Sequence, residues 1–232
     1  MFRQFLRKII PTHAILPLCL TGLTNLMAYQ GAKLFQLLFG FDNAWDITST
    51  FDAATPFMPA WVLVYIGTYL FWFYQYTAVA KESPRMACKL AVADGVAKLI
   101  CLLFFVLVPT TNTRPEVEGS GLIPFLMRGI YFLDTPSNLF PSIHCFVAYM
   151  GTRYLFVCKT LRRKALTCTL CSIGTLLVFA STLLTKQHVL VDVLGGIAVS
   201  EIGCLVARFT KLPQRLEPLA QAFAQTKLGK FL

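Results

Sequence analysis

The chain alternates between long apolar runs and short segments that are polar, basic or rich in turn-forming residues. We expect six of the apolar runs to be helices, over residues 13–38, 57–80, 88–109, 141–158, 165–185 and 188–209. Several of these runs reach or approach the roughly 20 residues that a helix needs to cross a bilayer. A soluble domain would show amphipathic helices or alternating strands instead. The pattern therefore predicts an all-α polytopic membrane protein, a bundle of six transmembrane helices in a single membrane domain over residues 1–232.

Two further segments have weaker apolar patterns. The loop from Thr110 to Phe140 contains the stretch GLIPFLMRGIYFL, which is apolar but short and interrupted by Pro and Gly. An interfacial or partly inserted helix suits this stretch better than a crossing. Residues 210–232 are basic and amphipathic, so we expect them to form a cytoplasmic tail that lies on the membrane surface.

Composition agrees with a membrane protein, and the charges orient it. The 232 residues are 56% hydrophobic and only 14% charged, with a net charge of +10. Fifteen of the 21 Lys and Arg lie in the amino terminus, in the loops after the second and fourth runs, or in the tail. Positive loops stay cytoplasmic, which predicts that both termini are inside. The excess charge attracts anionic lipid headgroups, so we expect membrane lipids and no nucleic acid as partners.

This topology brings three polar clusters to one depth in the membrane. Arg114 follows the outer end of the third run, His144 begins the fourth run from outside, and His188 begins the sixth. Two of the three histidines in the chain are among them. We therefore predict one site on the extracytoplasmic face.

The segment SNLFPSIHCF is suited to holding a phosphate group. Pro141 fits the first turn of a helix, and the residues before it can cap that helix. The first backbone N–H groups would then be unpaired, as in many anion sites. Ser142 adds a hydroxyl donor and His144 a transferable proton. An ordinary capped helix with an interfacial histidine is the alternative.

The segment TKQHVLVDVLGG places His188 and Asp192 four residues apart, on one helix face. The carboxylate can hold one imidazole nitrogen and free the other as a nucleophile or base. An aspartate inside a span costs about 2.5–3.5 kcal/mol, so we expect a role for it. A purely structural pair is the alternative. A metal site with His144 is a further alternative, but the pairing of His188 with Asp192 competes with it, and we expect no metal.

Taken together and in this order, the three clusters resemble the signature of the type 2 phosphatidic acid phosphatase superfamily over about residues 57–209. The residues that match its three motifs are Arg114 with Pro115, Pro141 with Ser142 and His144, and Ser181 with His188 and Asp192.

The resemblance implies a membrane phosphatase that hydrolyses a lipid phosphate or pyrophosphate monoester at the outer face, with no cofactor. His188 would be the nucleophile and form a phosphohistidine, Asp192 would orient and stabilise it, and His144 would protonate the leaving alkoxide. Arg114, Ser142 and nearby backbone amides would hold the phosphoryl oxygens. Guanidinium matches phosphate oxygens in a bidentate fork, although a lone arginine at a membrane boundary can also be an anchor.

Two cations of the family pattern are absent, because Leu107 and Thr182 stand where the family has Lys and Arg. Lys186 is our candidate to replace one of them in substrate binding, and Arg128 is a second. The relaxed pattern is also similar to the inositol phosphorylceramide and sphingomyelin synthase branch, whose members pass a phosphoryl headgroup to a lipid alcohol. A non-catalytic lipid-binding membrane protein is the third alternative.

Overall fold

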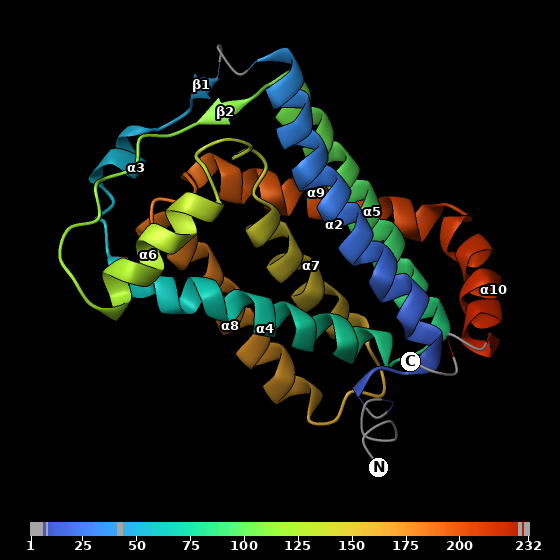
Figure 1. The fold of residues 1–232 in the computed structure, drawn as a ribbon. Coiled ribbons are helices and arrows are strands. Elements are labelled where there is room, and N and C mark those ends of the chain that lie inside the picture. Colours follow the sequence, from blue (N-terminus) through green and yellow to red (C-terminus); the bar gives the residue numbers. More distant parts are fainter. Residues whose placement is uncertain (1–6, 8, 41–43, 227–228, 230–232) are drawn as a thin grey trace.

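The computed structural model describes residues 7, 9–40, 44–226 and 229, and most of them are helical. Its helices are α2 (Thr12–Phe39), α3 (Thr50–Ala54), α4 (Val62–Ala80), α5 (Pro84–Leu107), α6 (Leu122–Leu133), α7 (Ile143–Val157), α8 (Lys164–Leu184), α9 (Leu190–Phe209) and α10 (Leu212–Gln225), with a 3-10 turn η1 (Pro59–Trp61) (Figure 1). The predicted all-α class is confirmed, and each of the six predicted runs is helical over most of its length. A two-stranded parallel pair, β1 (Trp45–Asp46) and β2 (Thr110–Thr111), was not expected.

Three of these helices, α5, α8 and α9, are long and apolar enough to cross a membrane, which indicates a membrane protein. Helices α2 and α4, with 28 and 19 residues, are long enough to cross but are not among these three. Helix α7, with 15 residues, is shorter than the roughly 20 that a perpendicular crossing needs. Helix α6 has 12 residues and is apolar, in agreement with the short helix expected there.

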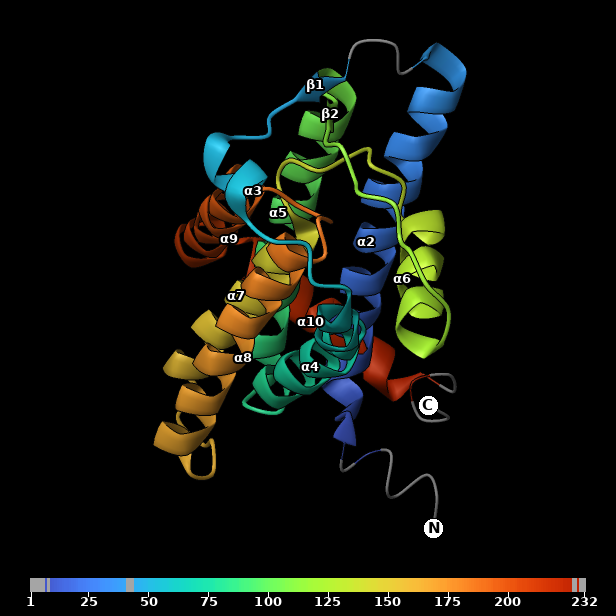
Figure 2. The ribbon, with the colours of Figure 1, turned by 90° about the vertical axis from the view of Figure 1, so that its left-hand side faces the viewer.

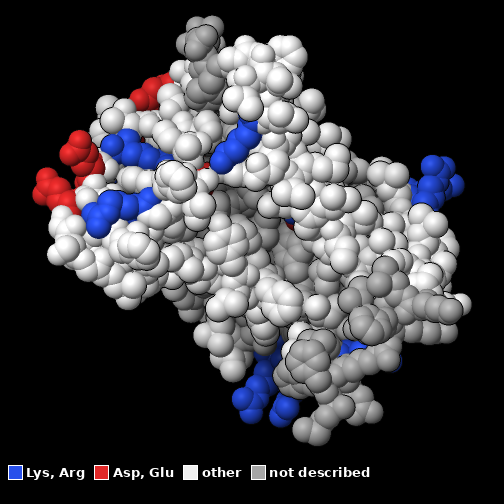
Figure 3. Space-filling view, in the orientation of Figure 1, with Lys and Arg blue, Asp and Glu red and all other residues white. Residues whose placement is uncertain are grey.

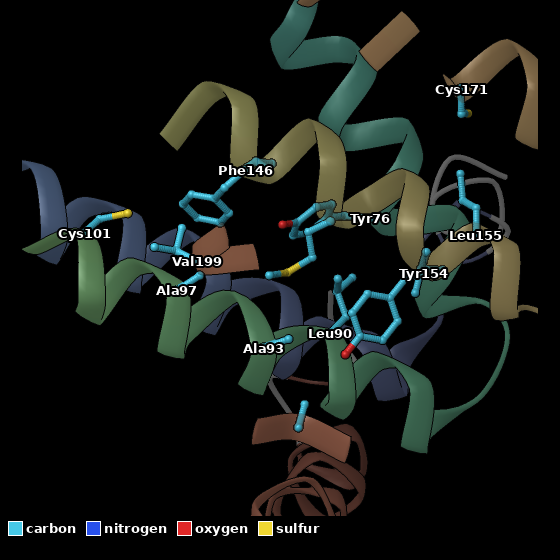
Figure 4. Close-up of a cluster of buried hydrophobic side chains, with 14 of the residues drawn as sticks. Tyr76, Leu90, Ala93, Ala97, Cys101, Phe146, Tyr154, Leu155, Cys171 and Val199 are labelled. Carbon is cyan, nitrogen blue, oxygen red and sulfur yellow. The ribbon is translucent and has the colours of Figure 1, made fainter. Parts of the chain in front are cut away.

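The helices pack around a core formed mainly by α5, α7 and α9. Helix α5 lies along α2 and packs against α9, while α7 packs against α4, α8 and α9 (Figures 1 and 2). Helix α10 turns back against α5 and α2. Buried side chains from α2, α4, α5, α7, α8 and α9 meet in this core, among them Tyr76, Ala93, Ala97, Phe146, Tyr154 and Val199 (Figure 4).

The basic loops that the charge pattern assigns to one side of the membrane lie at one end of the bundle. The Glu82 carboxylate, between α4 and α5, accepts the backbone N–H of Lys159, after α7, at 2.7 Å. The His13 imidazole at the start of α2 hydrogen-bonds the carbonyl of Ala80, at the end of α4, at 3.0 Å. The starts of α7 and α9 lie at the other end of the bundle, away from these basic loops (Figure 1).

Two glycines of α9 let its neighbours approach closely. A Cβ on Gly203 would lie 2.2 Å from the carbonyl oxygen of Ala93, so the backbones of α5 and α9 are in contact. A Cβ on Gly196 would lie 2.8 Å from the carbonyl oxygen of Ser142. This second contact brings the first turn of α7 against the first turns of α9.

Candidate functional site

His144 and His188 line the same cavity, which has a volume of about 230 Å³. His144 lies in the first turn of α7, and His188 lies two residues before α9. The centroids of the two imidazole rings are 5.8 Å apart. The close contact between α7 and α9 therefore brings together two histidines that are 44 residues apart in the sequence.

Asp192 holds one nitrogen of His188. The Nδ1 atom of His188 lies 3.1 Å from Oδ2 of Asp192, and the two side chains are 6% and 0% exposed. The same oxygen accepts the backbone N–H of Val189 at 3.0 Å, which caps the first turn of α9. This arrangement favours the tautomer with the proton on Nδ1 and leaves the lone pair of Nε2 available. No hydrogen bond to Nε2 is found among the residues that the structure describes.

The ring of His144 is surrounded by aromatic side chains. The centroid of its ring lies 4.6 Å from that of Tyr65, 5.1 Å from that of Trp72 and 6.0 Å from that of Tyr69. Its Nε2 atom is buried and has no hydrogen-bond partner in the described part of the chain. A buried nitrogen of this kind calls for an explanation, and a ligand group in the adjacent cavity would provide its missing partner.

Ser142 hydrogen-bonds both α7 and α9. Its hydroxyl accepts the N–H of Cys145 at 3.2 Å, which makes Ser142 the N-cap of α7. Its own N–H donates to the carbonyl of Asp192 at 3.1 Å. This N–H is therefore paired, whereas the sequence predicts that the first N–H groups of the helix are unpaired. The N–H groups of Ile143 and His144 have no acceptor within the described residues, and they are the free donors at this helix start.

Arg114 lies beside His188 but does not line the cavity. One guanidinium nitrogen donates to Oε1 of Gln187 at 2.8 Å, and another donates to the backbone carbonyl of Asp134. The guanidinium also lies over the ring of Tyr131, 4.9 Å from its centroid. Burial lowers the pKa of Arg114, and the neighbouring carboxylate and tyrosines oppose this shift. The predicted phosphate-binding arginine is thus bound by Gln187, the residue next to His188.

Lys186 faces away from the cavity that His144 lines. Its ammonium donates to the carbonyl of Asp52 at 2.6 Å and to that of Thr55, so it holds the segment around α3. It lines a second cavity of about 210 Å³, which His188 also borders. Arg128 is bound to two carbonyls of the loop before α6, at 3.0 and 3.1 Å. The charged groups of Lys186 and Arg128 therefore both donate to backbone carbonyls of this chain.

The two positions that lack the family cations are not open to the cavity. Leu107 is 72% exposed at the end of α5. Thr182 is fully buried, with its hydroxyl bound to the carbonyl of Phe179 at 2.8 Å and its Oγ1 atom 3.7 Å from the sulfur of Cys145. A long cationic side chain has no room at position 182.

Asp134 is a site residue that the sequence patterns did not single out. Its carboxylate lines the cavity with the two histidines and accepts the hydroxyls of Tyr29 and of Tyr65, the latter at 3.1 Å. Burial alone would raise its pKa, but His144, the bond from Tyr29 and His188 outweigh burial, and the pKa is lowered. The cavity therefore contains a charged carboxylate close to both imidazoles.

In comparisons with protein-family models, with curated proteins and with solved structures, nothing matches this chain. Within residues 7, 9–40, 44–226 and 229, no three His, Cys, Asp or Glu side chains are grouped as metal ligands would be. The case for a function therefore depends on the geometry of the site.

Proposed function

We propose that the chain is an integral-membrane phosphatase that hydrolyses a lipid phosphate or pyrophosphate monoester through a phosphohistidine. The observation that carries this proposal is the shared cavity of His144 and His188, in which the second histidine is held by the fully buried Asp192. Two imidazoles at this separation can act on the two ends of one phosphorus–oxygen bond, as a nucleophile and an acid must.

In the first step, the lone pair of His188 Nε2 attacks phosphorus, an N–P bond forms, and the P–O bond to the lipid breaks. His144 gives its proton to the leaving oxygen, which departs as the lipid alcohol. The phosphorylated imidazole keeps its Nδ1 proton and carries a positive charge. The Asp192 carboxylate, 3.1 Å from Nδ1, stabilises that charge.

In the second step, water attacks the phosphohistidine from the side that the alcohol has left. His144, now neutral, takes the proton of this water, and the N–P bond breaks to release inorganic phosphate. The free N–H groups at the start of α7 stabilise the phosphoryl oxygens during both steps, and Arg114, held by Gln187, adds its positive charge from outside the cavity. His188 and His144 then have the protonation states with which the cycle began.

We also propose that α2, α4, α5, α7, α8 and α9 cross the bilayer, with both termini and the basic tail in the cytoplasm. The meeting of the two basic loops at one end of the bundle supports this orientation. The starts of α7 and α9 are at the other end, so the cavity would face the extracytoplasmic side.

The test uses the full chain, purified in detergent with a chelator and supplied with phosphatidates and isoprenoid pyrophosphates. Half of the samples also contain ceramide or diacylglycerol, and both free phosphate and lipid products are followed. We expect phosphate release that is lost in His188→Ala and kept in the matched control His13→Ala, since His13 contacts Ala80 at the other end of the bundle. Headgroup transfer with little free phosphate would assign the chain to the transferases instead. No turnover by folded protein would contradict both readings.

A further inference from the structure

A long groove runs between α2 and α4, next to the catalytic cavity. Its volume is about 630 Å³, and its walls are mostly apolar or aromatic, with Leu18 and Gly22 on the α2 side and Phe73 on the α4 side. In the face shown in Figure 3, the hollow near the centre is bordered mostly by uncharged residues. A groove of this size with apolar walls is suited to a hydrocarbon chain.

The groove and the catalytic cavity share walls. Asn25, Tyr69 and Trp72 border both. Two of these side chains, Tyr69 and Trp72, are also ring neighbours of His144. A molecule whose polar end lies between the two histidines can therefore continue past these aromatic rings into the groove.

Where the groove meets the catalytic cavity, one hydrogen-bond donor has no partner. The indole Nε1 of Trp72 is buried and has no acceptor among the residues that the structure describes. Because a buried donor without a partner is costly, an oxygen of a bound molecule at this point would stabilise the complex. The first oxygens of a lipid, next to its phosphate, are of this kind.

Among the described residues that line the groove, the one charged side chain is already neutralised. The ammonium of Lys98 lies 2.7 Å from the Asp94 carboxylate and donates to the carbonyl of Thr21 at 2.7 Å. The groove is therefore not a second anion site, and its far part offers an apolar surface.

We infer that the groove between α2 and α4 binds the hydrocarbon chain of the substrate, which enters from the bilayer between these two helices, so that the enzyme selects phosphate esters by chain length. This inference rests on the proposed phosphatase function. It specifies the substrate class as a phosphate monoester with one long apolar chain in the protein, rather than a water-soluble phosphate.

The test fills the groove with a side chain. A Cβ on Gly22 would meet no heavy atom within 4 Å, so Gly22→Leu adds a leucine to the groove without a backbone clash. Gly67 on α4 is equally open and does not line the groove, which makes Gly67→Leu the matched control. The full chain in mixed micelles is assayed with hexadecyl phosphate and butyl phosphate, and the ratio of the two kcat/KM values is the readout.

We expect a large ratio in the wild type, a fall of about tenfold or more in Gly22→Leu, and no change in Gly67→Leu. A ratio that is unchanged in Gly22→Leu, or that falls equally in both variants, would overturn the inference. If the wild type hydrolyses neither ester, the proposed function fails, and direct binding of hexadecyl phosphate decides about the groove. In that case, weaker binding by Gly22→Leu alone supports the groove, and equal binding by all three proteins refutes it.

Discussion

Replacing Asp192 by asparagine removes a charge and leaves the hydrogen bonds around it in place. Oδ2 accepts from His188 and from the N–H of Val189, and the amide oxygen of asparagine can make both bonds from the same position. The other carboxylate oxygen has no partner in the described part of the chain, so an NH2 group in its place breaks no bond. Asp192→Asn therefore tests the charge of the carboxylate.

The expected loss follows from the 3.1 Å separation of Nδ1 and Oδ2. Two unit charges at this distance attract each other by about 5 kcal/mol at an effective dielectric constant of about 20. The neutral hydrogen bond that remains recovers about 1 kcal/mol. Since 1.4 kcal/mol corresponds to a factor of ten, we expect kcat to fall by about 10³-fold.

The assay is phosphate release under saturating lipid phosphate, with thermal unfolding of the same protein preparations in detergent. Asp192→Asn should unfold close to the wild-type temperature, whereas Asp192→Ala also loses the cap of α9, worth about 1 kcal/mol. A kcat within threefold of wild type in a folded Asp192→Asn protein would refute the idea that this carboxylate stabilises a charged His188.

Three further predictions concern packing and pH. Thr182→Arg should unfold the protein rather than improve phosphate binding, because Thr182 is fully buried and has no room for a charged side chain. Thermal unfolding together with KM checks this. Gly203→Ala should lower the free energy of unfolding by about 1–3 kcal/mol because the new methyl group clashes with Ala93, whereas Gly67→Ala should leave it unchanged. Chemical denaturation of both variants in micelles measures this difference. The carboxylate of Asp134 has a pKa below its ordinary 3.8, so it stabilises the fold above that pH and this contribution is lost as the pH falls through the lowered pKa. The stability advantage of wild type over Asp134→Asn should therefore shrink below about pH 4, and parallel pH curves would speak against this.

The six helices α2, α4, α5, α7, α8 and α9 were predictable because each coincides with a long apolar run, whereas their ends were predicted only to within several residues. Helix α5 begins at Pro84, four residues before the predicted start at 88, and Ser142 caps α7 in place of a residue before Pro141, which lies outside the helix. The β1–β2 pair was not predictable, because it joins two residues from each of two distant loops. Such short strand pairings form only because the helices place the two loops side by side, and no local sequence pattern predicts them.

The site was predictable where its residues are local in the sequence, or where the order of the helices brings them to one end of the bundle, as it does His144 and His188. His188 and Asp192 are one helical turn apart, so their pairing follows from spacing. The carboxylate of Asp134 meets hydroxyls of Tyr29 and Tyr65, which come from two other segments, and only tertiary packing joins the three.

The orientation of Lys186 could not be predicted for a different reason. Its backbone has a positive φ of 53°, in a turn between α8 and α9, and this turn directs the ammonium to the carbonyls near α3. Positive φ is uncommon for a lysine, and the residues TKQH do not signal it. Lys186, close in sequence to His188, therefore lies outside the cavity that His188 shares with His144.

The central claim is that His188 carries the phosphoryl group during turnover. The most direct measurement mixes the purified chain with a lipid phosphate labelled with radioactive phosphorus, quenches the reaction at early times in base, and maps the label on peptides. We expect an acid-labile, base-stable label on His188 that is absent in His188→Ala. Label on His144 or on any other residue, or hydrolysis that persists in His188→Ala, would contradict it.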